Sequence, residues 1–426
     1  MDRRLTLKLT AAAVASALLA ACGQQEAPKQ AAAPAAAPAQ VVKIGFAAPL
    51  TGAQAHYGKE MQNGIVLALE EVNAEQPKLA GQPVRFELIS EDDQADPKQG
   101  AAVAQKLVDA KIQGMLGHFN SGTSIPASRI YMEAGIPQIA MATSPAYTTQ
   151  GFKTTFRAMT SDTQQGAVAG RFMVETLKLK RIAIVDDRSA YGQGLADEFE
   201  KAAKAAGGEI VKREFTNDKA VDFKAILTSI KSAKPDLVYF GGADAQGGPM
   251  MKQMKELGLD ATFAGGEMIK SPNFLKLAGA AAEGAIASLA GLPLAKMPGG
   301  AAYATKYKAR FNMEVEVYSP YSYDAAKSLT GAMRRADSAD PAKYLPELAK
   351  TKLAGVTTAN LEYDEKGDLK DGGITIYRVE GGEWKELQSV GQQAGFGLCP
   401  TVDRRTGPKS VLPLASADDR RLTPRW

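Results

Sequence analysis

The chain has 426 residues, of which 45% are hydrophobic and 23% are charged, so it can bury a large core and form two or three domains. Its formal net charge is +4, but residues 1–21 contribute +2 and residues 391–426 contribute +3, which leaves −1 on residues 22–390. A body this close to neutral gives no electrostatic reason to expect nucleic acid or an anionic membrane surface as a partner.

The N-terminal segment, residues 1–21, has the features of a secretory signal peptide: a basic start and an apolar stretch from Leu9 to Ala21 that is too short to span a membrane. The run Leu-Ala-Ala-Cys at 19–22 resembles a bacterial lipobox, in which the cysteine receives a diacylglyceryl group and becomes the new N-terminus. We therefore expect a lipoprotein anchored through Cys22 on the periplasmic or cell-surface side of a bacterial membrane. The alternative is an ordinary signal peptide followed by a chance cysteine.

Residues 22–40 form an Ala/Pro/Gln tract without large apolar side chains, so we expect an extended linker between lipid and domain. The only other cysteine is Cys399. If Cys22 is acylated, no intrachain disulfide can form.

From residue 41 onward, short apolar strands alternate with amphipathic helices, which predicts a largely parallel α/β sheet. Strands are expected at 42–46, 84–89, 113–117 and 138–142, and helices at 59–75, 97–110 and 125–134. A second set follows Arg157, with helices at 162–178, 192–206 and 222–233 and strands at 181–185, 209–215 and 236–240. Two similar sets predict two similar lobes.

The last third of the chain follows other patterns. Residues 299–350 are expected to be mainly helical, and 360–389 carry Gly-containing hairpin turns at 367–368, 372–373 and 381–382. Residues 391–426 have neither periodicity nor a strand run, so we expect a disordered tail. Two origins for it stay open, a basic tail or translation past the natural end of the fold.

The sequence offers little for catalysis, so we expect no enzyme, no cofactor and no metal. The two histidines, His56 and His118, lie in no cluster with metal-ligand spacing. A nucleophile elbow, a Walker lysine and a CxxC pair are all absent, and the Gly192-x-Gly194 pair lacks the third glycine of a dinucleotide turn, where Asp197 stands.

Small polar residues instead gather in loops that follow strands, where an open α/β sheet binds ligands. These loops lie at 51–58, 119–124, 141–145 and 265–267. Hydroxyls and backbone N–H groups at helix N-termini suit a carboxylate. The alternative is that Ser121 and Ser144 only cap helices.

The chain resembles the leucine/isoleucine/valine-binding protein family of type I periplasmic binding proteins. The similar stretches span nearly all of 41–390 in order: KIGFAAPLTGAQAHYGKEMQNG (43–64), EDDQADPKQGAAVAQKLV (91–108), GHFNSGTSIPASRIY (117–131), RIAIVDDRSAYGQGLAD (181–197), YFGG (239–242), GGE (265–267) and YDEKGDLK (363–370).

The resemblance implies an α/β fold of two Rossmann-like lobes joined by a three-segment hinge. The first lobe would combine residues 41–159 with 292–358, and the second 160–289 with 360–390. It also implies capture of a small amino acid by hinge closure, and we expect a branched-chain one. The partners would be the permease and ATPase subunits of an ABC importer, with the binding protein a monomer that touches the membrane only through its lipid.

The resemblance also implies roles for single residues. Ser121 and the backbone of Ala142 and Ser144 match the clamp for the ligand's α-carboxylate. Thr143 is the alternative to Ser144, because this chain is one residue shorter than the family pattern before Gly151. Glu267 matches the acid that receives the α-ammonium. Three tyrosines match the side-chain pocket: Tyr57, Tyr191 and Tyr318.

Two positions depart from the leucine-type pattern, since Ala243 stands where an aromatic residue is usual and Met268 where a glycine is usual. The sequence therefore leaves open which apolar amino acid is bound. A second hypothesis is a ligand-sensing protein of the same fold for another small amino acid or amide, although no output domain is visible. A secreted hydrolase is a third, disfavoured because no nucleophile and base are paired in the sequence.

Overall fold

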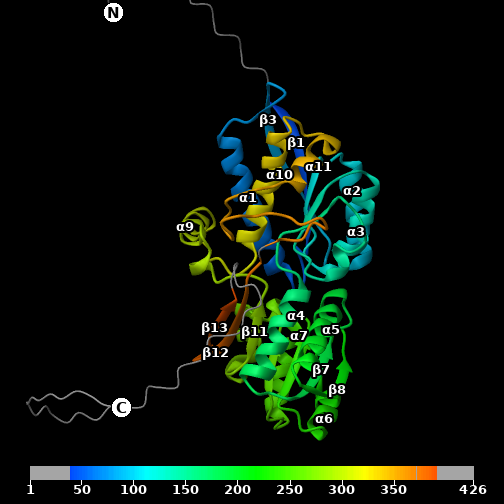
Figure 1. Ribbon diagram of the computed structural model, residues 1–426, viewed down its shortest axis with the longest axis vertical. Coiled ribbons are helices and arrows are strands. Elements are labelled where there is room, and N and C mark those ends of the chain that lie inside the picture. The colour runs from blue at the N-terminus through cyan, green and yellow to red at the C-terminus, as the bar shows by residue number, and fades with distance from the viewer. Residues whose placement is uncertain (1–38, 371, 391–426) are drawn as a thin grey trace, which may run out of the picture. The chain divides into compact units, whose positions relative to one another are not determined.

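Strands and helices alternate along most of the chain, as the hydrophobic pattern predicts. The computed structural model describes residues 39–370 and 372–390. The predicted signal peptide, Cys22, most of the linker and the tail at 391–426 lie outside the described residues. The described strands form two separate sheets (Figure 1).

The first sheet has six strands in the order β2-β3-β1-β4-β5-β6. They are β1 (Gln40–Ala48), β2 (Lys78–Leu79), β3 (Gln82–Asp92), β4 (Gly114–Gly117), β5 (Gln138–Ala140) and β6 (Thr155–Arg157). All neighbours run parallel except β2, which is antiparallel to β3. Parallel strands covered on both faces are continuous apolar runs, and β1 is accordingly buried from Ile44 to Ala48.

Helices from two distant stretches of the chain cover this sheet, and together with it they form the first lobe. They are α1 (Ala55–Ala74), α2 (Pro97–Asp109), α3 (Ser121–Glu133), α9 (Gly300–Phe311), α10 (Ser319–Arg335) and α11 (Pro341–Ala349). Helix α10 packs on α1 and α11, while α2 packs on α3 on the other face of the sheet (Figure 1).

The second sheet has seven strands in the order β13-β12-β11-β10-β9-β7-β8. They are β7 (Arg181–Asp186), β8 (Glu209–Phe215), β9 (Leu237–Gly241), β10 (Thr262–Gly265), β11 (Ile286–Leu289), β12 (Ile374–Glu380) and β13 (Glu383–Val390). The helices of this second lobe are α4 (Asp162–Arg171), α5 (Ala190–Ala205), α6 (Lys224–Ser232), α7 (Asp244–Glu256) and α8 (Pro272–Ala278). The predicted hairpin turn at Gly381 and Gly382 joins β12 to β13, with φ of +64° and +79°.

The chain passes between the sheets after β6, after β11 and before β12. Residues 361–370 contact the first sheet, where the Arg157 N–H donates to the Gly367 carbonyl at 2.8 Å. The lobe boundary at 358–360 stays a prediction, and these contacts favour a later third crossover.

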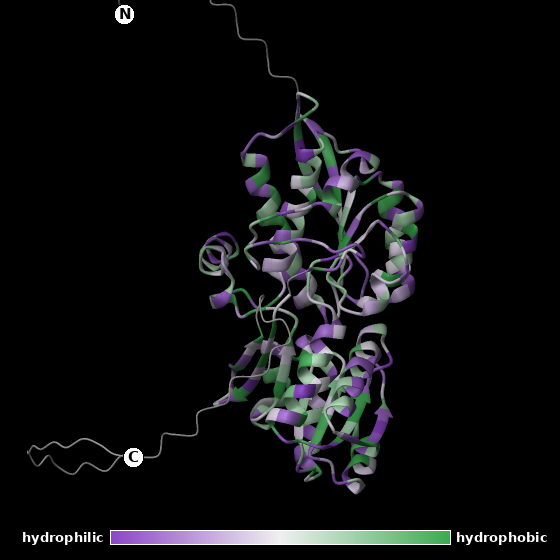
Figure 2. Ribbon diagram, in the orientation of Figure 1, coloured by the Kyte–Doolittle hydropathy of each residue, from purple (hydrophilic) through white to green (hydrophobic). Residues whose placement is uncertain are grey.

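Some elements differ from the sequence-based expectation. Helix α3 begins at Ser121, four residues earlier than predicted. The sequence did not indicate this first turn because the run Ser-Gly-Thr-Ser has low intrinsic helix propensity. The helix predicted at 162–178 is α4 followed by one π-helical turn at Phe172–Thr176. Hydrophobic residues are frequent in the strands (Figure 2), and most of those in the central strands are buried. No described helix has the length and apolarity needed to cross a bilayer.

Candidate functional site

Loops at the carboxyl ends of β4 and β5 bring the predicted carboxylate clamp together. Ser121 is the first residue of α3, and residues 142–144, named the clamp loop below, follow β5. The Ser144 N–H donates to Ser121 Oγ at 3.3 Å, and both residues are buried. Because carboxyl ends of neighbouring parallel strands meet at one edge of a sheet, these donors form a site suited to an anion.

Glu267 faces the clamp loop from the second lobe. It opens a short 3₁₀ turn directly after β10, and only 3% of it is exposed. The Thr143 hydroxyl donates to Glu267 Oε1 at 3.4 Å, and Gln165 Nε2 donates to Oε2 at 2.6 Å. The structure therefore brings Ser121, the clamp loop and Glu267 into one buried place, with Thr143 linking the two lobes.

Thr143 and Ser144, which the sequence left as alternatives, both face this place with different groups. Thr143 offers its hydroxyl to Glu267, and Ser144 offers its backbone N–H beside Ser121. The Ser144 side chain lies against Gly194 of α5, where a Cβ would come within 3.4 Å of the Ser144 hydroxyl oxygen.

A second buried acid, Asp162, was missed by the sequence analysis. It is the first residue of α4, it is fully buried, and both carboxylate oxygens lack a hydrogen-bond partner among the described residues. Its backbone N–H donates to the Thr143 carbonyl at 2.8 Å. The sequence offered only an acid at the start of a helix, which ordinarily marks a solvated first turn.

Both acids are held in a state that resists ionisation. Burial raises the pKa of Asp162 well above its usual range, and the charge of Glu267 adds to this. Burial also raises the pKa of Glu267, against the hydrogen bond that Gln165 donates. Within residues 39–370 and 372–390, neither carboxylate forms an ion pair. Two buried carboxyl groups that form no ion pair in the described residues make a site that a ligand ammonium group would satisfy.

The three predicted tyrosines are all buried near this place. Tyr57 and Tyr318 pack edge to face at 5.4 Å between ring centroids, and Phe119 contacts both rings. The Tyr57 hydroxyl donates to the Met268 carbonyl at 2.6 Å, which joins the first lobe to the second.

Tyr191 lies close to Gly266, the residue before Glu267. A Cβ on Gly266 would lie 2.4 Å from the Tyr191 hydroxyl, so only glycine admits this approach. The hydroxyls of Tyr191, Tyr239 and Tyr318 have no hydrogen-bond partner among the described residues. Such orphaned buried groups are costly, which is consistent with a site built to receive polar ligand atoms.

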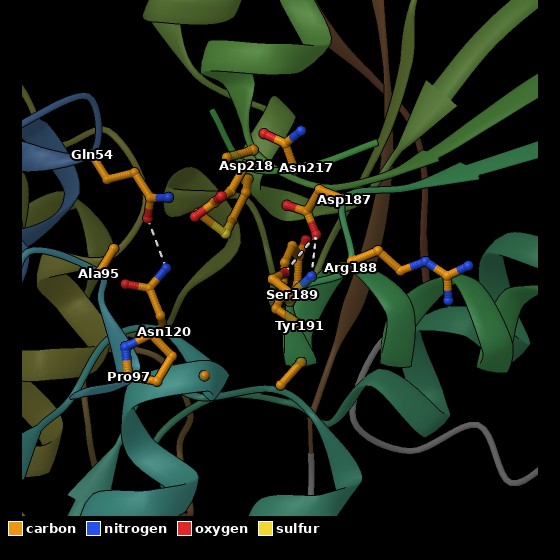
Figure 3. Close-up of a pocket in the computed structure, with 14 residues that line it drawn as sticks. Gln54, Ala95, Pro97, Asn120, Asp187, Arg188, Ser189, Tyr191, Asn217 and Asp218 are labelled. Carbon is orange, nitrogen blue, oxygen red and sulfur yellow. Dashed lines mark hydrogen bonds between the residues drawn. The ribbon is translucent and has the colours of Figure 1, made fainter. Parts of the chain in front are cut away.

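A cavity of about 390 Å³ opens beside this place, with walls from both lobes (Figure 3). Tyr191, Ala243 and Met268 line it, so the two departures from the leucine-type pattern lie on the same surface. On the first-lobe wall, Asn120 Nδ2 donates to Gln54 Oε1 at 2.7 Å.

Each histidine is paired with an aspartate far away in the sequence. His118 Nδ1 lies 2.7 Å from Asp93 Oδ2 inside the first lobe. His56 Nε2 lies 3.0 Å from Asp244 Oδ2, and this contact crosses from α1 to α7. In the described part of the chain, no group of three or more His, Cys, Asp or Glu residues could hold a metal.

The chain is similar to known proteins over most of its length. Residues 41–383 match the family model described as periplasmic binding protein. The Leu/Ile/Val-binding protein homolog 1 of Brucella melitensis is 37% identical over 342 residues, which cover 80% of this chain and 91% of that protein. The leucine-, isoleucine-, valine-, threonine- and alanine-binding protein of Pseudomonas aeruginosa is 35% identical, with 80% and 90% covered.

Solved structures share the fold. The leucine binding protein LivK of Thermotoga maritima matches with a TM-score of 0.77 and 26% identity over 82% of this chain and 99% of that one. The branched-chain amino acid transporter substrate binding protein LivJ of Streptococcus pneumoniae, in complex with isoleucine, matches with a TM-score of 0.74 and 25% identity over 83% and 100%. The fold expected from the sequence is thereby confirmed, and the chain belongs to the periplasmic binding protein family.

Proposed function

We propose that this protein is the extracytoplasmic solute-binding component of an ABC importer for amino acids, and that its ligand is a branched-chain L-amino acid. One arrangement supports the proposal above all. Hydroxyl and amide donors of Ser121 and Ser144 lie in one buried place with the Glu267 carboxylate of the other lobe. A zwitterion has the two opposite charges that such a place requires.

In this proposal the ligand carboxylate binds to the Ser121 hydroxyl and the N–H groups of the clamp loop. The ammonium binds to Glu267, with Asp162 as a second acid nearby. Since the acids resist ionisation when no cation is present, an incoming ammonium stabilises their charged forms. A ligand without the ammonium would leave both acids unpaired.

The side chain of the ligand would meet a cluster of aromatic rings beside the cavity. The rings of Tyr57, Phe119 and Tyr318 pack on one another, and Ala243 and Met268 line the adjoining cavity. The names of the relatives include leucine, isoleucine and valine, and the Pseudomonas aeruginosa name adds threonine and alanine. We expect an aliphatic side chain to pack on these rings.

Capture would occur by closure of the two lobes around the ligand, and no covalent bond would be made or broken. Groups from both lobes contact the ligand in this proposal, and only a ligand with different affinities for the open and closed states shifts that equilibrium. The closed monomer would then dock on permease and ATPase subunits. We further propose that acylated Cys22 tethers the protein to the membrane through the 22–40 linker.

The test is a thermal-shift panel of the twenty amino acids against residues 41–390, followed by calorimetry. A ligand of the folded form raises the melting temperature by mass action. We expect leucine, isoleucine and valine to give the largest shifts. Two truncated leucines serve as controls: 4-methylpentanoate, which lacks the ammonium, and 3-methylbutylamine, which lacks the carboxylate.

Both truncated compounds should fail to shift the melting temperature at concentrations where leucine saturates. Binding of 4-methylpentanoate as tight as that of leucine would remove the acids from the site and contradict the zwitterion model. A panel in which no amino acid binds would overturn the proposed ligand class.

A further inference from the structure

One stretch that resembles the family closely, YDEKGDLK at 363–370, contributes none of the residues placed around the ligand above. It folds as a tight turn, in which Asp364 Oδ1 accepts from the Lys366 and Asp368 N–H groups at 2.8 and 2.9 Å. Gly367 has a φ of +92°, and a Cβ there would lie 2.0 Å from the Thr155 carbonyl oxygen. The turn is therefore seated directly on β6.

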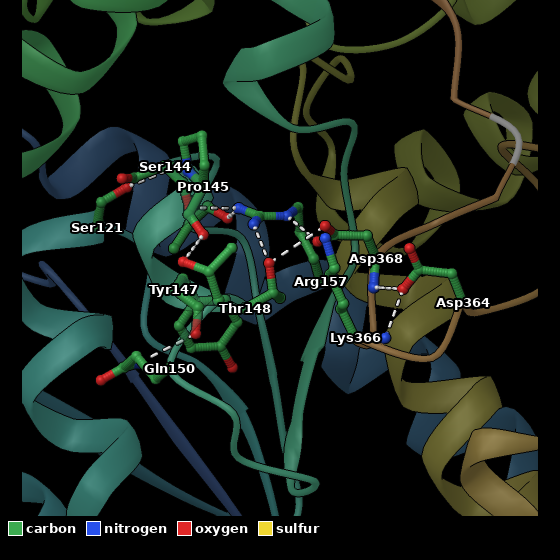
Figure 4. Close-up of polar contacts among 12 residues, drawn as sticks. Ser121, Ser144, Pro145, Tyr147, Thr148, Gln150, Arg157, Asp364, Lys366 and Asp368 are labelled. Atoms are coloured by element: carbon green, nitrogen blue, oxygen red, sulfur yellow. Dashed lines mark hydrogen bonds and ion pairs between the residues drawn. The ribbon is translucent and has the colours of Figure 1, made fainter.

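The turn ends in an ion pair with a buried arginine at the end of β6. Arg157 is fully buried, and its Nε donates to Asp368 Oδ1 at 2.7 Å (Figure 4). Arg157 Nη2 donates to Thr148 Oγ1 at 2.8 Å, and the Thr148 hydroxyl donates to Asp368 Oδ2 at 3.1 Å. The guanidinium is thus fixed in a closed network rather than held by one contact.

The remaining nitrogen of this guanidinium reaches the clamp loop. Arg157 Nη1 donates to the Ala142 carbonyl and, at 3.1 Å, to the Ser144 carbonyl. The Thr143 carbonyl between them accepts from the Asp162 N–H at 2.8 Å. All three carbonyls of the clamp loop therefore accept hydrogen bonds, so its orientation is set by the Arg157 guanidinium and the Asp162 backbone.

We propose that Arg157 is a positioning residue for ligand binding, which fixes the clamp loop to the 363–370 turn so that the Ser144 N–H and the Thr143 hydroxyl face the ligand. This inference rests on the proposed function. A planar guanidinium can donate to the loop carbonyls and to Asp368 at once, whereas a lysine ammonium cannot span them. The turn beside the third crossover thereby couples the hinge to the clamp.

The positive charge of Arg157 also acts on the buried acid Asp162. Arg157 is the cation that opposes the rise in the pKa of Asp162. Glu267, the acid that contacts the clamp loop through Thr143, remains the main partner proposed for the ligand ammonium.

The test compares Arg157→Lys with Arg213→Lys in the full chain. Arg213 is a matched control, because it donates to three carboxylates, those of Asp186, Asp197 and Glu200, but lies in the second lobe away from the clamp loop. Both variants should lower the melting temperature. Only Arg157→Lys should raise the Kd for L-leucine, by at least tenfold, while Arg213→Lys stays within twofold of the unmodified protein.

A second readout needs no ligand. Amide hydrogen exchange of peptides covering 140–150 should accelerate at least tenfold in Arg157→Lys and stay unchanged in Arg213→Lys, because the loop carbonyls lose their donor. Equal Kd values and equal exchange at 140–150 in the two variants would overturn the positioning role. Failure of the unmodified protein to bind leucine would count against the proposed ligand, and hydrogen exchange would still decide the role of Arg157.

Milder variants serve if Arg157→Lys does not fold. Thr148→Val removes one member of the network, and the exposed neighbour Thr149→Val is its control. We expect a two- to fivefold rise in Kd and faster exchange at 140–150 for Thr148→Val alone. Identical behaviour of the two valine variants would contradict the network's role.

Discussion

Replacing Glu267 by glutamine keeps the size of the side chain and removes its charge. Both hydrogen bonds can persist, since the amide oxygen can accept from Gln165 and the Thr143 hydroxyl can accept from the amide nitrogen. The variant therefore tests the charge with little change in packing.

The expected loss of affinity follows from the burial of the site. A hydrogen bond to a charged group contributes about 1.5–3 kcal/mol, and leaving a buried charge without its partner costs about 3–5 kcal/mol. Asp162 lies in the same place and limits the loss. We expect Glu267→Gln to weaken L-leucine binding by about 2–3 kcal/mol, which is roughly 30- to 150-fold in Kd.

The same variant should leave the empty protein as stable as before, or more stable. Burial raises the pKa of Glu267, so the charged carboxylate destabilises the ligand-free fold at neutral pH, and an amide removes that penalty. Affinity and stability should therefore change in opposite directions.

Calorimetry with L-leucine at pH 7 measures the first effect, and thermal unfolding without ligand measures the second. Asp186→Asn is the control, because Asp186 is a buried carboxylate of the same lobe that pairs with Arg213. A Kd for Glu267→Gln within twofold of the unmodified protein would refute the assignment of Glu267 to the ammonium.

Three further changes have distinct expected outcomes. Burial lowers the pKa of His56, but the hydrogen bond to Asp244 in the other lobe and the charge of that carboxylate outweigh burial, so the pKa lies above 6.5. The protonated histidine therefore stabilises the closed lobes fully below pH 6.5, and this stabilisation is lost as the pH rises through the raised pKa. Relative to His56→Gln, the unmodified protein should lose about 1 kcal/mol of leucine affinity, roughly fivefold in Kd, between pH 6 and pH 8 in calorimetry; parallel pH profiles would remove the pair from closure. Tyr57→Phe deletes a hydrogen bond between the lobes and should weaken binding by about 1 kcal/mol, whereas Tyr344→Phe, which deletes a partly buried hydrogen bond inside the first lobe, should leave the Kd unchanged. Cys22→Ser should move the protein from the membrane fraction to the soluble fraction, and continued sedimentation with membranes would refute lipid anchoring.

Much of the fold could be predicted from the sequence because parallel strands buried on both faces are short, apolar and bounded by helices. The strands at 42–46 and 181–185 are clear examples, and each is paired with a parallel neighbour on both sides. Elements with weak local signals were harder. Strands β10 and β11 are four residues each, and the start of α3 depends on tertiary contacts that outweigh its low propensity.

The site could be predicted only in part. Ser121 and Ser144 follow neighbouring strands, so their closeness follows from the topology. The residue pattern placed the 265–267 loop among the ligand-binding loops, but the approach of Glu267 to the clamp loop depends on how the two lobes meet, which no local pattern encodes. Only the family resemblance assigned Glu267 to the ammonium. Asp162 and Arg157 escaped notice because charged residues at element ends are ordinarily solvated, and here both are fully buried.

The outer strands of the second sheet affect how the protein behaves at high concentration. Strands β8 and β13 are its two edges, and both carry charged side chains along their length, including Lys212, Arg213, Lys385 and Glu386. Another chain that added a strand to either edge would have to bury those charges beside its own. The edges therefore discourage aggregation through intermolecular strand pairing, even where many copies are crowded together.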